Sequence, residues 1–212
     1  RDMSRLQELI FWRKTLKLVI LALISEHGGD MGRLTGSQTE INLLRAFAGK
    51  SQERNRYDFF AEQAVSEGLP VIAHMFQDTA EHARTHALRL FEHLEGGKVT
   101  VCDSFAAEGI SGTLTNLIAA AGEEYLCWSC VYPAFADIAR QEGFEAVAAL
   151  FDGIAVADQF HERRFRDCLR KLESDSMLRS PDTVEWLCSK CAYTREGREA
   201  PSSCPVCGHP AG

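Results

Sequence analysis

Residues 144–172, FEAVAALFDGIAVADQFHERRFRDCLRKL, carry the clearest pattern in the chain. Apolar side chains recur every three or four positions, which is the spacing of one face of an α-helix. Two polar residues, Asp158 and His161, lie on the same face. The segment therefore predicts a long helix that buries an apolar stripe with two polar groups in it. The stripe consists of Phe144, Val147, Phe151, Ile154, Asp158, His161, Phe165, Cys168 and Leu172.

Three earlier segments have the same periodicity, at about 39–67, 70–94 and 113–141. Two of the three links are short, and residues 96–112 form a long connection without periodicity. This order predicts an all-α four-helix bundle with a long crossover between the second and third helices. Pro133 predicts a kink in the third helix. The expected inward residues are Leu43, Phe47, Lys50, Arg54, Tyr57 and Ala61, then Ile72, Phe76, Thr79, Ala83, His86, Leu90 and Leu94, then Leu114, Leu117, Ala121, Glu124, Val131, Phe135 and Ile138.

The C-terminal segment contains two C-x-x-C pairs, Cys188 with Cys191 and Cys204 with Cys207. Four thiolates at this spacing form a tetrahedral site for one ion. The spacing is compatible with iron or zinc, and it predicts a small rubredoxin-like metal-knuckle domain. Gly208 follows the second pair, whereas Ala192 holds the equivalent place after the first. A left-handed backbone at Ala192 is expected to cost about 1 kcal/mol.

Composition sets the domain boundaries and excludes one class of partner. The net charge of −7 gives no electrostatic support for binding nucleic acid. Four of the six prolines follow residue 180, so a loop-rich tail follows a helical body. We expect a helical extension at 1–30, the bundle at 31–173, a linker at 174–184 and the tail domain at 185–212. The other four cysteines, Cys102, Cys127, Cys130 and Cys168, are scattered, which favours a reducing, cytoplasmic compartment over a disulfide scaffold.

The N-terminal segment has an uncharged apolar run at 18–24, preceded by Arg13, Lys14 and Lys17. The run is far shorter than the roughly 18 residues that a membrane span needs. It resembles the apolar part of a signal peptide, but no small-x-small cleavage site follows it. An amphipathic helix is the favoured interpretation, and we expect no membrane span.

Polar residues at inward positions mark a candidate site inside the bundle. Asp158 and His161 are on the fourth helix, Glu124 on the third, His86 on the second and Lys50 on the first. A buried carboxylate is costly unless it is paired or binds a metal. One such residue is commonly structural, whereas several at one level of a bundle predict a site.

Several motifs together resemble the rubrerythrin family. They are AFAGKSQERNRY at 46–57, FEHLEGG at 91–97, VYPAFA at 131–136 and IAVADQFH at 154–161, with the two C-x-x-C pairs of the tail. The resemblance covers residues 31–210 and implies a ferritin-like diiron bundle that reduces hydrogen peroxide. It also implies that electrons arrive from the tail iron, and that one subunit of a homodimer serves the diiron site of its partner.

The same resemblance shows where this sequence departs from the family. Lys50, Ala83 and Cys127 fall at positions where the family has glutamate ligands, whereas His86, Glu124, Asp158 and His161 keep a usable ligand. Counting Glu124 and Asp158 against Lys50, we expect too little negative charge for two irons. Three outcomes remain. In the first, Lys50 replaces one metal and pairs with Glu124 or Asp158. In the second, one metal binds Glu124, Asp158 and His161, with His86 as a further ligand. In the third, Cys127 supplies thiol chemistry or soft metal ligation, with Cys130 one turn away and a thiol pKa lowered by Lys50.

Two functions of different classes follow. The first is a rubrerythrin-like iron protein in electron transfer and peroxide defence, whose bundle binds at most one metal. The second is a non-enzymatic electron carrier, or a subunit that docks a partner through residues 1–30, with a metal-free bundle. Both need a redox partner protein, and metal content separates them.

Overall fold

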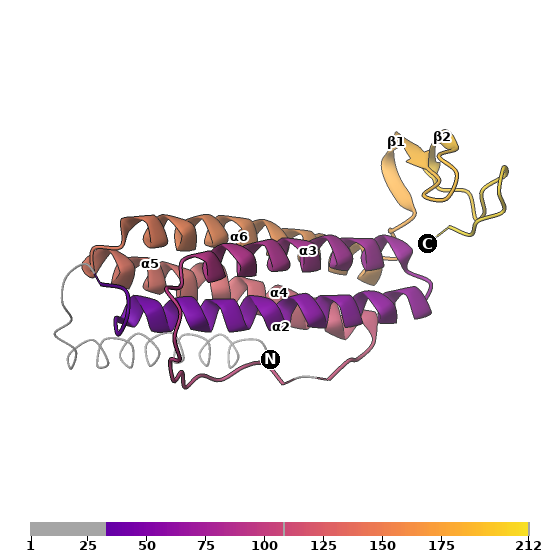
Figure 1. Cartoon of the computed structure of the whole chain (residues 1–212). Coiled ribbons are helices and arrows are strands. Elements are labelled where there is room, and N and C mark those ends of the chain that lie inside the picture. The colour runs from indigo at the N-terminus through magenta and orange to yellow at the C-terminus, as the bar shows by residue number, and fades with distance from the viewer. Residues whose placement is uncertain (1–32, 108, 212) are drawn as a thin grey trace, which may run out of the picture.

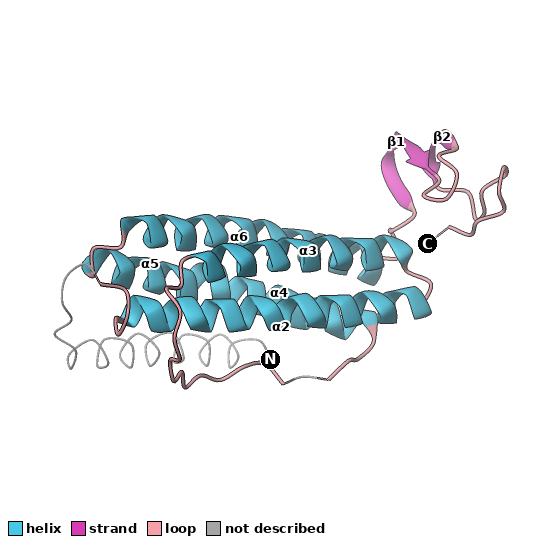
Figure 2. Ribbon diagram, in the orientation of Figure 1, coloured by secondary structure: helices cyan, strands magenta, loops and turns pink. Residues whose placement is uncertain are grey.

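The protein is described by a computed structural model covering residues 33–107 and 109–211. The helical extension predicted at 1–30 lies outside these residues. Figure 1 shows long helices lying side by side, with a small domain at one end. The helices are α2 (Gln38–Ser66), α3 (Pro70–Glu92), α4 (Thr113–Leu126), η1 (Cys127–Val131), α5 (Tyr132–Gln141) and α6 (Glu145–Glu173). The strands β1 (Arg179–Leu187) and β2 (Thr194–Glu199) form a hairpin, so the predicted bundle and tail are confirmed (Figure 2).

Local signals define the ends of the first two helices. Ser37 caps α2 by accepting a hydrogen bond from the N–H of Glu40 at 3.0 Å, and the Glu40 carboxylate accepts one from the N–H of Gly36 at 2.7 Å. These contacts satisfy N–H groups that a helix start leaves free. Gly68 has a φ of +75°, which a glycine adopts without a clash. Pro70 then begins α3, where its missing N–H costs little.

The third helical segment is interrupted before Pro133 rather than at it. α4 ends at Leu126, and η1 is a short π-helix in which the N–H of Tyr132 bonds the carbonyl of Cys127, five residues back. The helix continues as α5, with Pro133 in its first turn. The irregularity beside Pro133 is thus a π-helical turn that ends before the proline. The proline lies at a helix start, where its missing N–H leaves no bond broken.

The bundle interior consists of two apolar clusters separated by a polar layer. One cluster packs Tyr57, Phe60, Phe76 and Phe165 together. The other is built around Leu43 on α2, Leu90 on α3, Tyr132 on α5 and Phe151 on α6. The polar layer is formed by α2, α3, α4 and α6. It consists of Lys50, Glu53, His86, Glu124, Asp158 and His161, with Ala83 and Cys127 beside them.

Two of the predicted inward positions are wrong. Arg54 is exposed and Glu53 is buried in its place, because the inward face of α2 passes from Lys50 to Tyr57 through position 53. Leu114 is 41% exposed, in the first turn of α4. The long crossover between α3 and α4 runs along the outside of the bundle (Figure 1). No helix among the described residues is both long and apolar enough to cross a membrane.

The tail domain is a hairpin followed by a second loop. β1 begins at Arg179, inside the range predicted as linker, and Leu187 at its end pairs with Thr194 of β2. Trp186 donates a hydrogen bond from its ring nitrogen to the carbonyl of Gly197 at 3.0 Å, which joins the two strands. The first cysteine pair therefore lies in the hairpin turn, and the second lies in the loop after β2.

Candidate metal centres

The four tail cysteines converge from two turns with the same backbone pattern. In the first, the N–H of Ala192 bonds the carbonyl of Cys188 at 2.9 Å, and in the second the N–H of Gly208 bonds that of Cys204 at 2.9 Å. The φ angles are +59° at Ala192 and +72° at Gly208, so both turns use a left-handed residue after the pair. The strained backbone expected at Ala192 is thus confirmed.

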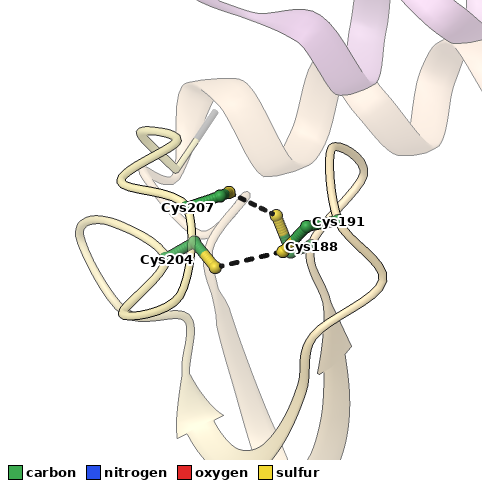
Figure 3. Close-up of side chains that lie close together, drawn as sticks. All are labelled: Cys188, Cys191, Cys204 and Cys207. Atoms are coloured by element: carbon green, nitrogen blue, oxygen red, sulfur yellow. Dashed lines mark hydrogen bonds between the residues drawn. The ribbon is translucent and has the colours of Figure 1, made fainter.

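The sulfur atoms fit a single tetrahedral ion. Cys188 Sγ lies 3.7 Å from Cys207 Sγ, and Cys191 Sγ lies 3.6 Å from Cys204 Sγ (Figure 3). All four sulfurs lie within 4.8 Å of one another. A metal–sulfur bond of about 2.3 Å implies tetrahedral edges of about 3.8 Å, which these contacts match. Backbone N–H groups, first that of Cys207, lower the pKa of Cys204 to about 7, so this thiol is ready to ionise.

Lys50 fills the centre of the polar layer in the bundle. Its ammonium lies 2.8 Å from both carboxylate oxygens of Asp158 and 2.6 Å from Oε2 of Glu53. Oε2 of Glu124 lies further away, at 4.0 Å. The pKa of Lys50 is raised well above its ordinary value, because Asp158 and then Glu53 outweigh the opposing effect of burial. The predicted pairing of Lys50 with Asp158 is confirmed.

Glu53 is the site residue that the sequence reasoning missed. It is 2% exposed, and it binds Lys50 from the next turn of α2. Burial raises the pKa of Glu53 to about 7, against the lowering effect of Lys50. The signal was present in the sequence, because position 53 lies three residues after Lys50 and four before Tyr57. The pocket therefore holds three carboxylates rather than the two that we had counted.

Glu124, Asp158 and His161 are brought together next to Lys50, and Asp158 belongs to both groups of contacts. The phenol of Tyr57 donates a hydrogen bond to Glu124 Oε1 at 2.8 Å. Nδ1 of His161 lies 3.5 Å from Glu124 Oε1 and 3.6 Å from Asp158 Oδ1. These two carboxylates raise the pKa of His161 to about 9, although burial opposes the shift. One ligand atom from each of the three residues lies within 4.8 Å of the others.

Three buried polar atoms in this part of the pocket have no hydrogen-bond partner. They are Oε2 of Glu124, Nδ1 of His161 and Nδ1 of His86. Burial lowers the pKa of His86 to about 4, so its ring is neutral and has a lone pair available. Buried polar atoms are normally paired, and three unpaired ones in the same pocket mark a place for a water or a cation. A single cation thus fits this half of the pocket.

Cys127 does not behave as the sequence suggested. Its Sγ lies 3.9 Å from Glu53 Oε1, inside the pocket. The pKa of Cys127 is raised well above its usual value, first by burial and then by Glu53, and Lys50 only partly offsets this. Lys50 does lower the pKa of this thiol, as expected, but burial and the charge of Glu53 outweigh it, so the net shift is upward. Cys127 is a neutral thiol that fills space beside Glu53.

A pair of metal ions does not fit these residues. Ala83 contributes a methyl group to the layer, and Lys50 contributes a positive charge. A dication about 4 Å from an ammonium is repelled by roughly 8 kcal/mol at an effective dielectric constant of about 20. With Glu53, Glu124 and Asp158 all ionised and His161 neutral, the positive charge of Lys50 leaves a net of two negative charges. This charge balances one dication and leaves a second without compensation.

Comparison with known proteins agrees with this architecture. The rubrerythrin family model matches residues 42–169, and the model of the rubredoxin-like domain of rubrerythrins matches residues 186–212. The rubrerythrin of Nitratidesulfovibrio vulgaris is 46% identical over 180 residues, which are 85% of this chain and 94% of the relative. That of Porphyromonas gingivalis is 45% identical over 177 residues, covering 84% and 88%.

A solved structure has the same fold. Nigerythrin in its fully reduced, all-ferrous state is 27% identical, with a TM-score of 0.57 over 88% of each chain. The matched family models cover both the ferritin-like bundle and the four-cysteine tail. Together with relatives at this level of identity, they establish that the chain belongs to the rubrerythrin family of non-haem iron proteins.

Proposed function

We propose that the protein transfers single electrons through iron bound by Cys188, Cys191, Cys204 and Cys207, and that its bundle binds at most one metal ion. The observation that carries the second part is the position of Lys50, whose ammonium holds both oxygens of Asp158 at 2.8 Å. In the tail, iron supplies one-electron redox chemistry, and the cysteines and backbone N–H groups set its potential. Membership of the rubrerythrin family supports a role in electron transfer and peroxide defence.

Charge favours one metal position in the bundle. Glu53 and Asp158 are neutralised in part by Lys50, while Glu124 Oε2 and His161 Nδ1 have no hydrogen-bond partner. We place the single ion between Glu124, Asp158 and His161. The ring of His86, whose centroid lies 6.1 Å from that of His161, is the further ligand that the sequence suggested. Imidazole and carboxylate together suit a divalent iron, manganese or zinc ion. The ligand atoms of Glu124, Asp158 and His161 lie within 4.8 Å of one another, which supports this position.

A metal-free bundle is the alternative. Lys50 occupies both oxygens of Asp158, which removes that carboxylate from a metal unless the ion pair opens. A protonated His161 then balances part of the remaining charge, since its pKa is about 9. In this case the protein is an electron carrier or a docking subunit whose bundle is a scaffold.

We also infer a homodimer in a reducing, cytoplasmic compartment, with a separate redox protein that supplies electrons to the tail. The resemblance to the family supports the dimer, and so do the exposed apolar side chains along α4. These are Leu114, Ile118, Tyr125 and Leu126, each at least 38% exposed. Light scattering of the purified chain is expected to give about twice the 23.6 kDa chain mass. A mass of one chain contradicts the dimer.

Metal content tests the proposal directly. Elemental analysis is expected to find one iron per chain in the tail, and at most one further ion in the bundle. The double variant Lys50→Glu with Ala83→Glu removes the ammonium and adds two carboxylates, so iron uptake should rise by at least one ion per chain. Arg54→Glu is the matched control, because it adds an acidic residue to the exposed side of the same helix. Three irons in the wild-type protein would refute the proposal.

A further inference from the structure

His82 connects the solvent-exposed side of α3 to the buried His161 of α6. Its Nδ1 lies 3.2 Å from Nε2 of His161. The planes of the two rings are only 11° apart, and their centroids are 5.2 Å apart. The contact is therefore a hydrogen bond between ring nitrogens, with the two rings nearly parallel. His82 itself is exposed, whereas His161 is 3% exposed.

The two ring nitrogens of His161 have different surroundings. Nδ1 faces Glu124 and Asp158 at 3.5 and 3.6 Å, inside the pocket. Nε2 faces away from them, toward His82. A neutral imidazole carries one proton and one lone pair. When Nδ1 binds a cation, the proton must be on Nε2, and that N–H then needs an acceptor.

The neighbours of His82 leave its Nδ1 free to accept the Nε2–H of His161. Asp78, one turn before it, is bonded to Arg164 at 3.2 Å and lies 3.3 Å from His74. Among the described residues, His161 is the hydrogen-bond partner that the structure gives to the His82 ring. Histidines that bind metals usually donate their second N–H to a fixed acceptor, which sets the tautomer and the direction of the ring.

We propose that His82 is a positioning residue for the bundle site. It accepts the Nε2–H of His161 and holds the tautomer in which Nδ1 is free to bind one divalent cation with Glu124 and Asp158. This inference rests on the proposed single metal position. His82 touches neither the cation nor its carboxylate ligands, and it acts through His161 alone.

Binding of Fe²⁺ to the full-length protein tests the inference. The tail is first loaded with iron, and further Fe²⁺ is then measured by anaerobic equilibrium dialysis and elemental analysis. His82→Ala is expected to weaken binding in the bundle by about 10- to 100-fold. His82→Asn should restore most of it, because the amide oxygen of asparagine lies near the place of the histidine Nδ1. His82→Gln places its amide further out and should not. His74→Ala, on the same helix, is the control and should bind as the wild type does.

A spectroscopic measurement separates positioning from a loss of structure. In protein loaded with Zn²⁺, the Nε2–H of His161 should give a hydrogen-bonded, slowly exchanging signal in ¹⁵N–¹H spectra of labelled histidine. The signal should be lost in His82→Ala and return in His82→Asn, with the thermal unfolding midpoint unchanged.

The outcomes distinguish this inference from the proposed function. A wild-type bundle that binds one Fe²⁺, with equal affinity in His82→Ala, overturns the role of His82 and leaves the single metal position intact. Equal loss of binding in His82→Asn and His82→Ala also overturns it, because the acceptor atom would then not matter. A wild-type bundle that binds no Fe²⁺ beyond the tail iron overturns the metal position, and the inference fails with it.

Discussion

The tail and the bundle hold two ligand clusters that are built in opposite ways. In the tail, four identical ligands come from two short turns, and three of the four cysteines are at or near the surface. In the bundle, Lys50, Glu53, Glu124, Asp158 and His161 come from three helices, and all are nearly fully buried. The tail cluster therefore depends on local backbone geometry, whereas the bundle cluster depends on how long helices align.

This difference decides how each cluster responds to a change of residue. The tail has four equivalent negative ligands and one cation to bind, so losing any ligand removes the same interaction. The bundle mixes charges of both signs, so one side chain such as Lys50 takes the place of a cation. A mixed, buried cluster can thus lose a metal and remain folded, which the tail domain is too small to do.

The largest effect is expected for Cys204→Ala. Structural tetrathiolate sites contribute about 10 kcal/mol or more of apparent binding free energy, and in a domain this small that energy is also folding energy. The variant should lose its tail metal and the β1–β2 hairpin while the bundle stays helical. Absorption of the thiolate–iron charge transfer, elemental analysis and limited proteolysis between α6 and β1 measure these losses.

Cys168→Ala is the control for this prediction. Cys168 lies on α6, away from the tail cluster, and it contacts Met75 inside the bundle. The variant should keep its tail metal and a protease-resistant hairpin. A Cys204→Ala protein that keeps its tail metal would contradict the prediction, because the tail would then tolerate the loss of one ligand.

A smaller but substantial effect is expected for Lys50→Met. Methionine keeps the length of the side chain and removes the charge, which leaves Glu53 and Asp158 buried without their cation. Breaking a buried ion pair in this way costs about 3–5 kcal/mol. Urea unfolding of metal-free protein should show a loss of this size. Arg54→Met, at an exposed position of the same helix, should change the free energy of unfolding by less than about 0.5 kcal/mol.

The opposite outcome for Lys50→Met would be informative. If the variant is as stable as the wild type without metal, the carboxylates of Glu53 and Asp158 take up protons instead, and the charge of Lys50 is not needed. If Fe²⁺ restores stability to the variant alone, the ammonium of Lys50 and a metal ion compete for the same carboxylates.

The two clusters also differ in how far they were predictable. The tail ligands, their pairing in two turns and the strained Ala192 followed from spacing, because every interaction lies within a few residues. In the bundle, Lys50, Glu124, Asp158 and His161 followed from helical periodicity. Glu53 was missed although its spacing from Lys50 and Tyr57 is helical, because the neighbouring Arg54 fits the same stripe equally well. The contact between His82 and His161 depends on the alignment of α3 with α6, which no local pattern contains.

The break at Cys127–Val131 has a similar origin. Pro133 indicated an irregular helix. The place of the irregularity could not be predicted, because it depends on which backbone carbonyl loses its N–H partner. The chain inserts one extra residue into the turn before the proline, so that Tyr132 bonds Cys127 five residues back. Tyr132 and Phe135, which follow the break, then pack in one apolar cluster.

The pH dependence of the free energy of unfolding tests whether the buried Glu53 is protonated in the folded protein. Its pKa is about 7 in the folded protein against 4.5 when unfolded, so the folded state binds the proton more tightly. The stabilisation is fully present below about pH 4.5 and is lost as the pH rises through about 7, at no more than about 1.4 kcal/mol per pH unit. Glu53→Gln carries no such proton. The difference in free energy of unfolding between wild type and variant, measured in urea without metal, should therefore shift over this range.

The comparison with the variant isolates Glu53, because the other titrating groups are present in both proteins. The pKa of His161 is raised to about 9, so its contribution to stability is lost as the pH rises from 6.5 to about 9. A difference between wild type and Glu53→Gln that stays constant from pH 4.5 to 7 would mean that Glu53 is ionised throughout. Lys50 would then be paired with two full carboxylate charges.

The smallest effect concerns the matched turns of the tail, where the sequence differs and the backbone does not. Ala192→Gly relieves the left-handed φ of +59° and should stabilise the tail by about 1 kcal/mol, whereas Gly208→Ala should destabilise it by a similar amount. The guanidinium midpoint for loss of the thiolate–iron absorption measures both. Ala200→Gly is the control, because Ala200 has no positive φ and glycine there gains nothing. If Ala192→Gly leaves the guanidinium midpoint unchanged, the backbone strain at Ala192 does not contribute to the stability of the metal-bound tail. The ligand sulfurs, rather than the backbone, would then set the stability of the tail.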